Sequence, residues 1–456
     1  MQSEHTAAAA ATETGRDLPR TIGFWGASAV MVGVMIGSGI FATPPGIAEK
    51  MGSPMLVLAL WAAGGVLALM GALTFAELAA MYPRSGGVYV FLREGFGAPV
   101  AFVFGWTYIL LSKPLAAAGI AVVFATYLNN LLGTTWDPAI ATCLAIVLLT
   151  YINARGVRLG TDLAVVLTGC KMLALGAIVV LALVLVKGDA ANFADQPQPG
   201  HPTFWLAVVP VMAAILWTYD GWSDVGAIAG EVKNPQRMLP RIYLVGTAAV
   251  TVLYVAINAV YYWMLPVEQI AGSKTVAPLV MERLLGPQAG VAVSLLVVVS
   301  SIGSTHSSIM TGARVTFAQA RDGLMFGFLG TEHKTHRTPA VALWVQAALS
   351  CTAALWLGTF ERLAGGFVFT MWIWYGLGGI AIFVLRIKRP DAYRPYRCWG
   401  YPVVPAVFVL SAVAMTGLSV WQDPGTTLPW LGVLAAGLPV YFGWRWLGRR
   451  QGTKVG

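Results

Sequence analysis

The sequence GVMIGSGIF occupies residues 33–41, in the middle of an apolar stretch long enough to cross a membrane. A glycine inside a helix costs about 1 kcal/mol relative to alanine, and this stretch places a Gly-Ser-Gly run at residues 37–39. Non-helical backbone at membrane depth is tolerated only where it is buried or lines a cavity. The alternative explanation of these glycines is close packing against another helix, which the spacing of Gly33 and Gly37 would fit. A second interruption, WTYDGW at residues 217–222, favours two broken helices around a site.

The composition of the whole chain is that of a membrane protein. Hydrophobic residues make up 57% of its 456 residues and charged residues 11%, with a mean hydropathy of +0.71. Soluble domains average about 25% charged residues, and about 20 apolar residues suffice for a helix to cross the hydrocarbon core. The sequence therefore predicts an all-α integral membrane protein with twelve transmembrane helices, at residues 21–48, 54–76, 97–132, 136–154, 160–186, 203–229, 242–265, 287–313, 338–358, 363–385, 402–422 and 428–447.

The positions of the basic residues predict how the chain is oriented. Most of the 29 lysines and arginines fall in connections that lie inside if the N-terminus is inside. Cytoplasmic loops carry such an excess, so we expect a multi-pass protein of a bacterial-type cytoplasmic (inner) membrane with both termini cytoplasmic. The same bias accounts for the net charge of +9 without a nucleic-acid partner. The polar N-terminal residues show no signal-peptide pattern.

Two broken helices also predict the chemistry of the site between them. Corresponding interruptions in the two halves of a transporter mark a substrate site near the middle of the membrane. The N-terminus of a half-helix presents free N–H groups that suit a carboxylate, and exposed carbonyls at the other half-helix ends suit an ammonium. The expected ligand is therefore a zwitterionic α-amino acid.

Six motifs extend this interpretation to a family. They are GVMIGSGIF (33–41), AELAAMYPRSGGVYVFL (76–92), NARGVRLGTDLAVVLTGCKMLAL (153–175), YDGWSDVGAIAGEVKNPQRMLPR (219–241), GARVTFAQARDG (312–323) and RIKRPDAYRPYRCWGYP (386–402). In this order they resemble the amino acid–polyamine–organocation superfamily, close to its L-type amino acid transporter branch. The resemblance implies the leucine-transporter-like fold, a five-plus-five inverted repeat with two further helices. The predicted parts are a cytoplasmic tail (1–20), the first repeat (21–187), the second repeat (203–387), helices 11 and 12 (402–447) and a second cytoplasmic tail (448–456).

The resemblance also implies which residues hold the substrate. The backbone of residues 37–39 is expected to bind the carboxylate. The carbonyls of Met35, Trp217 and Asp220 are expected to receive the α-amino group. The Trp217 ring either covers the substrate side chain or is a packing residue. The implied substrate-binding set is Met35, Gly37, Ser38, Gly39, Ile40, Trp217, Tyr219, Asp220 and Gly221.

Lys171 lies deep in the fifth span, about 13 Å of helix rise beyond Asp162. A long side chain can snorkel part of that way without any role, but several relatives carry lysine in the same Thr-x-x-Lys context. In the implied fold this span approaches the first and eighth spans, where sodium-driven relatives hold a cation. We expect the Lys171 ammonium to meet carbonyls near Gly33 and the hydroxyls of Ser301 or Ser304. It would then replace the ion's charge and make transport independent of sodium.

Other ionisable groups predict a charge pair and an alternative coupling ion. Lys113 and Asp220 lie near the middle of their spans, where an unpaired charge costs about 2.5–3.5 kcal/mol, so we expect both charges to be compensated, and a pair between them is one way. The alternatives are backbone carbonyls around Lys113 and helix capping by Asp220. His306, at a position where relatives often have an Asn-Gly pair, is either a hydrogen-bonded structural group or a proton carrier. Glu77 and Glu231, near inner helix ends, either close a gate with arginines or form structural pairs.

Together these patterns predict a sodium-independent secondary transporter of neutral L-amino acids, working by exchange or facilitated flux through alternating access. A proton-coupled symporter using His306 or Asp220 is the alternative. A hydrolase would need a nucleophile with an oriented base and a channel a repeated filter, and the sequence shows neither.

The expected partners are amino acid substrates and the lipid bilayer. We expect no cofactor or metal, because the four cysteines and five histidines form no ligand pattern. Animal L-type transporters join a heavy-chain glycoprotein through a cysteine in the loop that corresponds to Asn130–Asp137. That loop has no cysteine here, so no disulfide-linked heavy chain is expected.

Overall fold

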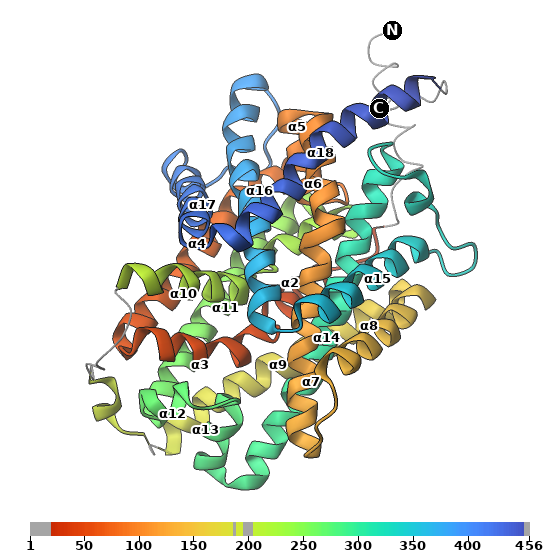
Figure 1. Ribbon diagram of the computed structural model, residues 1–456. Helices are drawn as coiled ribbons and strands as arrows, with labels where there is room; N and C mark the ends of the chain where they lie inside the picture. The colour runs from red at the N-terminus through yellow and green to blue at the C-terminus, as the bar shows by residue number, and fades with distance from the viewer. Residues whose placement is uncertain (1–19, 186–187, 195–203, 451–456) are drawn as a thin grey trace.

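The structure is a computed structural model that describes residues 20–185, 188–194 and 204–450 (Figure 1). The predicted tails lie almost wholly outside the described residues, as do the boundary positions 187 and 203 of the two predicted repeats. Within the described part of the chain every regular element is a helix, and the only β-type pairing is one parallel bridge between Ile22 and Val232.

Twelve helical segments are long and apolar enough to cross a membrane, which confirms the predicted number among the described residues. We number these spans 1 to 12. Spans 1, 3 and 6 are interrupted. In order the spans are α2 (Phe24–Met35) with α3 (Gly39–Met51), α4 (Pro54–Met81), α6 (Ala98–Thr107) with a π-helical turn (Tyr108–Ser112) and α7 (Lys113–Leu132), α8 (Pro138–Arg155), α9 (Val157–Leu185), α10 (Phe204–Tyr219) with the 3₁₀ helix η3 (Trp222–Glu231), α11 (Pro235–Met264), α14 (Pro287–Arg321), α15 (Ala340–Leu357), α16 (Phe360–Lys388), α17 (Val403–Gln422) and α18 (Pro424–Arg450).

Shorter helices mark the two ends of this bundle. Helix α5 (Val88–Phe96) lies at one end, and α12 (Val267–Ala271) and α13 (Val276–Leu285) lie at the other (Figure 1). We call these the α5 end and the α12–α13 end. Two further short helices are η2 (Ala190–Phe193) and η4 (Gly327–Gly330).

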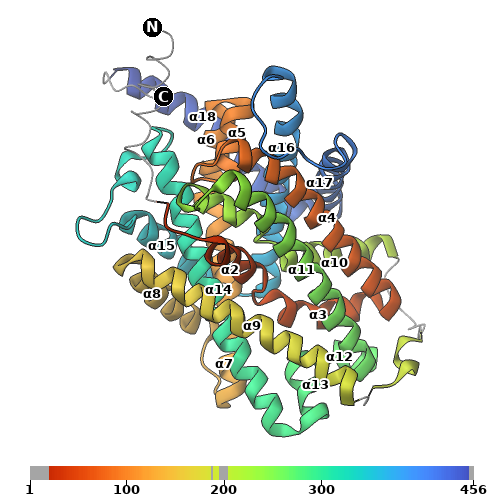
Figure 2. The ribbon, with the colours of Figure 1, turned by 180° about the vertical axis from the view of Figure 1, so that it is seen from behind.

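The packing of the spans follows a repeat of five. Span 2 packs on span 7, span 3 on span 8 and span 4 on span 9, so each of these helices contacts its counterpart in the other repeat. Likewise α2 of span 1 packs on span 5, and α10 of span 6 packs on span 10. Spans 11 and 12 lie outside this arrangement, with α17 against α16 and α4 and α18 against α6 (Figure 2). These contacts are those of the five-plus-five fold with two added helices.

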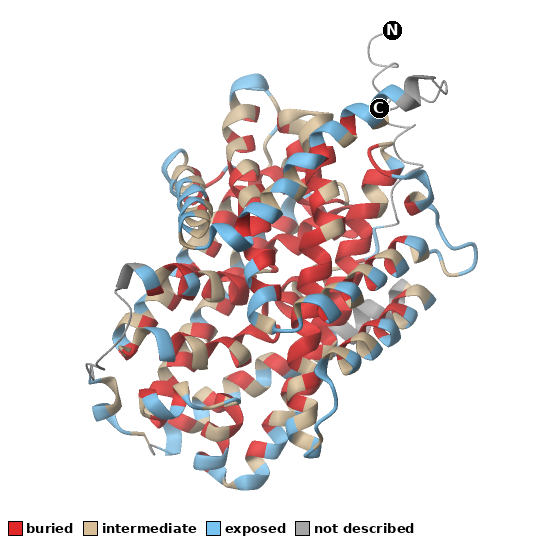
Figure 3. Ribbon diagram, in the orientation of Figure 1, coloured by how far each residue is buried: buried red, intermediate tan, exposed pale blue. Residues whose placement is uncertain are grey.

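Burial separates the central spans from the peripheral ones. The apolar windows of spans 1 and 3 are 78% and 83% buried within the protein, whereas those of spans 11 and 12 are only 17% buried. Figure 3 shows the same gradient, with buried residues along the middle of the bundle and exposed ones outside. Many of the exposed residues are large and apolar, among them Leu148, Val252 and Trp356. A lipid environment solvates such a surface, while the central spans are left to build a site.

The two breaks meet at the centre of the bundle. Helix α2 ends at Met35 and α3 begins at Gly39, while α10 ends at Tyr219 and Gly221 adopts a left-handed φ of 109°. A Cβ on Gly221 would lie 2.7 Å from Val34 Cγ1 and 2.8 Å from the Met35 nitrogen. Glycine is therefore required there both by its backbone conformation and by the close approach of the other break.

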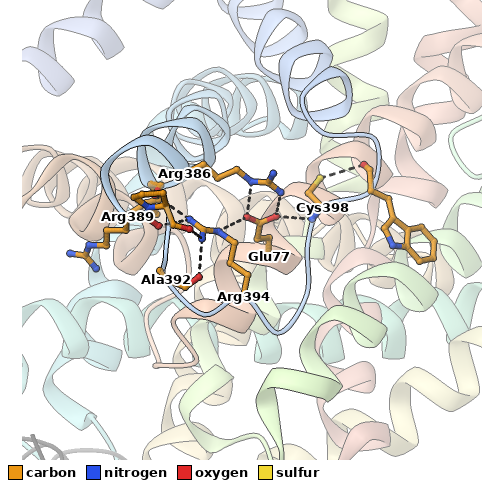
Figure 4. A network of polar contacts seen from close by, with 9 residues as sticks. Glu77, Arg386, Arg389, Ala392, Arg394 and Cys398 are labelled. Carbon is orange, nitrogen blue, oxygen red and sulfur yellow. Dashed lines mark hydrogen bonds and ion pairs between the residues drawn. The ribbon is translucent and has the colours of Figure 1, made fainter.

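Glu77 anchors the α5 end of the fold and takes no part in the interruptions of spans 1 and 6 (Figure 4). Its carboxylate has no exposed surface and forms ion pairs with Arg386 at 2.7 Å and Arg394 at 3.3 Å. It also accepts a hydrogen bond from the Cys398 backbone N–H at 2.7 Å. Arg394 in turn donates to carbonyls that end α16, including that of Arg389 at 2.8 Å. These contacts tie span 2 to span 10 and to the connection that leads into span 11. Of the two alternatives for Glu77, a gate or a structural pair, they correspond to the structural pair.

We expect Glu77→Gln to destabilise the protein. Breaking a buried ion pair costs about 3 kcal/mol, and the substitution leaves Arg394, which is 6% exposed, without a counter-charge. Thermal unfolding in detergent measures the loss. Glu94→Gln is the matched control, because Glu94 also pairs with two arginines but is 17% exposed and its partners Arg84 and Arg389 are 39% and 50% exposed. Equal losses from the two substitutions would contradict the anchoring role.

Candidate functional site

A small cavity lies where the two breaks meet. Its volume is about 30 Å³, close to the space of a single water molecule. Its walls come from spans 1, 3, 6, 8 and 10, and the lining residues are Val34, Met35, Gly37, Ser38, Gly39, Lys113, Ala116, Ile120, Trp217, Thr218, Asp220, Ser308 and Phe367. Six residues of the predicted substrate-binding set are among them. Ile40, Tyr219 and Gly221 are buried beside the cavity without lining it.

The span 1 side of the cavity presents hydrogen-bond donors. Among the described residues, no backbone acceptor is found for the N–H groups of Ser38, Gly39 or Ile40. The Ser38 hydroxyl is also buried without a partner. The first N–H groups of a helix are always left unpaired by the helix itself, and α3 begins at Gly39. The start of α3 therefore offers a cluster of donors and a positive dipole end to an anion.

Carbonyl acceptors on the span 1 side are largely occupied. The Met35 carbonyl accepts a hydrogen bond from the Gly37 N–H at 2.7 Å and another from the Tyr254 hydroxyl at 2.5 Å. A carbonyl has two lone pairs, so a substrate ammonium would have to share Met35 with Tyr254 or displace it. Tyr254 was not predicted, because nothing in the pattern of span 7 distinguishes one buried tyrosine from the others.

The end of α10 offers acceptors instead. The Trp217 carbonyl accepts the Asp220 N–H at 3.1 Å. Within the described residues, the carbonyls of Thr218 and Tyr219 have no hydrogen-bond donor. The last carbonyls of a helix carry its negative dipole end. Ser38 and Gly39 at the start of α3 and Thr218 at the end of α10 line the same cavity, so unpaired donors and an unpaired acceptor lie on its wall.

Lys171 of span 5 fills the gap behind the first break. Its ammonium donates to the carbonyls of Gly33 and Ile36, both at 3.1 Å, and to the Ser304 hydroxyl at 2.6 Å. The side chain is 2% exposed. The contacts with Gly33 and Ser304 were predicted, whereas Ile36 was missed. Ser301 was a wrong choice, because its buried hydroxyl makes no hydrogen bond.

The predicted ion pair between Lys113 and Asp220 is wrong, because the carboxylate that pairs with Lys113 is that of Asp224. Lys113 Nζ lies 2.8 Å and 3.1 Å from the two carboxylate oxygens of Asp224, and both side chains are nearly buried. Asp220 instead accepts a hydrogen bond from the Tyr375 hydroxyl at 2.6 Å. The reason is the left-handed turn at Gly221 and the 3₁₀ helix after it. They separate two acids that a continuous α-helix would place on one face.

Trp217 lies between this cavity and a larger one. Its ring packs edge-on against Phe360 and Phe367, with centroids 5.7 Å and 5.1 Å away. Phe367 lines the small cavity, whereas Phe360 lines a cavity of about 790 Å³ with walls from α3, α7, α10, α12, α16, α17, α18 and the segment after α12. The larger cavity is therefore on the α12–α13 side. The Trp217 ring stands where the two approach.

The α5 side of the site is closed by ion pairs. Arg314 of span 8 lies 2.9 Å from Glu231 at the end of η3, and both side chains are about 5% exposed or less. Lys113 and Asp224 add a second link, joined by the Thr311 hydroxyl at 3.2 Å from Asp224. The site thus has a large cavity on one side and buried ion pairs on the other.

His306 does not line the cavity. Its Nδ1 lies 3.1 Å from the Asn153 side-chain nitrogen, and its buried Nε2 has no partner among the described residues. The contact with Asn153 of span 4 fits the first of the two alternatives for His306, a hydrogen-bonded structural group.

Comparisons with known proteins show the family of the chain. A family model described as amino acid permease matches residues 22–438. The chain is 31% identical to b(0,+)-type amino acid transporter 1 of Mus musculus, over 89% of this chain and 84% of that protein. It is 30% identical to the cystine/glutamate transporter of Homo sapiens, over 91% and 83% of the two chains. It is also 30% identical to large neutral amino acids transporter small subunit 2 of Mus musculus, over 94% and 81%.

The fold and the site therefore define a multi-pass membrane transporter of amino acids and not an enzyme. The chain belongs to the amino acid permease family, in the L-type branch of the amino acid–polyamine–organocation superfamily.

Gly39→Ala should abolish substrate binding while leaving the protein folded. The added Cβ would lie 2.7 Å from Thr218 Oγ1 and 2.9 Å from its Cα, so it pushes the two breaks apart. Gly46→Ala, in the same helix, is the control, because its Cβ would meet nothing within 4 Å. Scintillation-proximity binding of labelled L-amino acids measures the effect. Unchanged binding by the Gly39 variant would contradict this site.

A charge swap tests the corrected ion pair. Lys113→Asp and Asp224→Lys should each lower thermal stability sharply, because each leaves two buried like charges together. The double variant should recover part of that loss. Combining Lys113→Asp with Asp220→Lys is the matched comparison and should recover nothing, since Tyr375 rather than Lys113 holds Asp220. Recovery with Asp220 and not with Asp224 would reverse the assignment.

Proposed function

We propose that this protein is a sodium-independent transporter of small neutral L-amino acids, working by exchange or facilitated flux. The observation that carries the proposal is the position of Lys171. Its ammonium replaces a cation among two carbonyls and a hydroxyl of spans 1 and 8. A second cation at the same place would meet a fixed positive charge at a distance of a few ångströms, which is strongly unfavourable in a buried site.

The charges around the cavity support a zwitterionic substrate. Lys113 and Asp224 cancel each other, and Asp220 supplies one further carboxylate on the cavity wall. That carboxylate and the α10 carbonyls suit the α-ammonium, while the N–H groups of residues 38–40 suit the carboxylate. A zwitterionic substrate with a neutral side chain then adds no net charge to the site.

The aromatic rings beside the cavity support a small side chain. Trp217 and Phe367 bound the cavity on the α12–α13 side. Gly119 lies under the Trp217 ring, where an added Cβ would be 3.0 Å from it. The ring is thus held from below as well as from the side, which limits the room beyond the substrate's α-carbon.

The membrane in which the protein lies, its orientation there and its independence of a partner chain are also proposals. We infer a cytoplasmic membrane of bacterial type with both termini cytoplasmic, on the distribution of lysine and arginine. The α12–α13 end, where the large cavity opens, would then face outward. We infer that the chain works without a disulfide-linked heavy chain, because the connection from Asn130 to Asp137 contains no thiol.

A proton-coupled symporter is the second candidate, and one observation favours it. Asp220 is an acid on the cavity wall whose only hydrogen-bond partner from a side chain is the Tyr375 hydroxyl, among the described residues. A proton taken up there would cancel the remaining charge. An imposed pH gradient separates the two candidates, since it drives accumulation only in a symporter, and Asp220→Asn would remove that drive.

Replacement of sodium by choline in proteoliposomes containing only this chain should leave L-alanine uptake unchanged. Lys171→Ala should lower the rate at least tenfold, because Gly33, Ile36 and Ser304 lose the group that joins them. Lys274→Ala, an exposed lysine on the wall of the large cavity, is the control and should transport normally. Uptake that collapses without sodium in the wild-type protein would overturn the proposal, and uptake that needs a second polypeptide would overturn its single-chain part.

A further inference from the structure

Two of the four cysteines lie opposite one another in the bundle. Cys143 is on α8 of span 4 and Cys351 is on α15 of span 9, 208 residues apart in sequence. The Cys143 sulfur lies 3.8 Å from the Cys351 carbonyl oxygen, and the Cys351 sulfur lies 3.9 Å from the Cys143 carbonyl oxygen. Each thiol therefore reaches the backbone of the other residue.

This reciprocal contact brings the two cysteines side by side. A disulfide needs Cβ atoms about 3.5–4.5 Å apart and side chains that point toward each other. A sulfur that contacts the carbonyl of the facing residue, in both directions, places each thiol against the backbone of the other cysteine, so that a rotation of the side chains brings the two sulfurs together. Helices α8 and α15 pack directly on one another along this contact.

The pair is also placed where a reagent can reach it. Cys143 is about 8 Å of helix rise from the start of α8, and Cys351 about 9 Å from the end of α15, both on the α12–α13 side. Both residues are partly exposed. The other two cysteines have no such neighbour. Cys170 is exposed on span 5, and Cys398 is buried beside Glu77 at the opposite end, where burial and the Glu77 charge raise the pKa of its thiol to about 11.

We propose that Cys143 and Cys351 form a redox-active dithiol that a disulfide reagent or other two-electron thiol oxidant closes into a bond between spans 4 and 9. One thiol attacks the reagent, loses its proton and releases one thiol leaving group as a mixed disulfide forms. The second thiol attacks that mixed disulfide and releases the other leaving group. Two protons and two electrons leave the protein, and one sulfur–sulfur bond is made.

The bond should not stop transport. Spans 4 and 9 already contact each other, and both pack on spans 3 and 8. Neither helix contributes a residue to the wall of the small cavity. Closing the bond joins residues 208 positions apart, and cross-links of long loops stabilise by restricting the unfolded chain. The oxidised protein should therefore unfold at a higher temperature and still carry substrate. This inference does not depend on which amino acid is carried or on the coupling ion.

The test uses full-length protein in proteoliposomes with Cys170→Ser, treated with 4,4′-dipyridyl disulfide. We expect release of two equivalents of pyridinethione, a cross-linked Cys143–Cys351 peptide in mass spectra, a rise of about 5 °C or more in the unfolding midpoint, and an L-alanine uptake rate within twofold of the untreated protein. Dithiothreitol should reverse the changes.

Further substitution with Cys143→Ser or with Cys351→Ser provides the matched controls. Each single-thiol protein should release one equivalent of pyridinethione, retain the pyridyl adduct and show no cross-link. Absence of the cross-linked peptide from the two-thiol protein would overturn the dithiol. A cross-link that abolishes uptake would show that spans 4 and 9 separate during transport. That result would overturn the expectation that the disulfide leaves transport unchanged.

Discussion

Backbone groups at the two helix breaks must find hydrogen-bond partners without water, and the structure is organised around that requirement. The carbonyls of Gly33, Met35 and Ile36 are taken by side chains of other spans, with Lys171 and Ser304 on one side and the Tyr254 hydroxyl on another. An unsatisfied polar group in hydrocarbon costs several kcal/mol. Among the groups that stay unpaired, the N–H groups of Ser38 and Gly39 and the carbonyl of Thr218 belong to residues that line the cavity. A substrate that carries both a carboxylate and an ammonium would pair with these donors and acceptors.

This requirement also explains how the spans are arranged. A lysine, a serine and a tyrosine can reach span 1 only if spans 5, 8 and 7 surround it, and the packing of α2 against α9, α14 and α11 provides this. The broken spans are consequently among the most buried in the bundle. The two ends of the site then differ, with a large cavity at the α12–α13 end and buried ion pairs at the α5 end. Such a difference is what one end state of an alternating-access cycle requires.

Much of this could be predicted from the sequence, because apolar length and glycine placement are local signals. The Gly-Ser-Gly run, the interruption at residues 217–222 and the depth of Lys171 each led to a feature that the structure contains. The partner of Lys113 could not be predicted. Asp220 and Asp224 are four residues apart, and only the φ of Gly221 and the 3₁₀ geometry of η3 decide which acid reaches span 3. Tyr254 and Ile36 were missed for a similar reason, since their role depends on which faces of the spans meet.

Recognition of both ends of an α-amino acid is the central claim, and competition for labelled L-alanine uptake tests it most directly. L-Alaninamide lacks the carboxylate, L-lactate lacks the ammonium, and both keep the size of alanine. If the unpaired N–H groups of α3 and the unpaired carbonyls of α10 hold the two charges, unlabelled L-alanine will inhibit uptake and neither analogue will do so at tenfold higher concentration. Inhibition by either analogue at the concentration at which alanine acts would contradict the account.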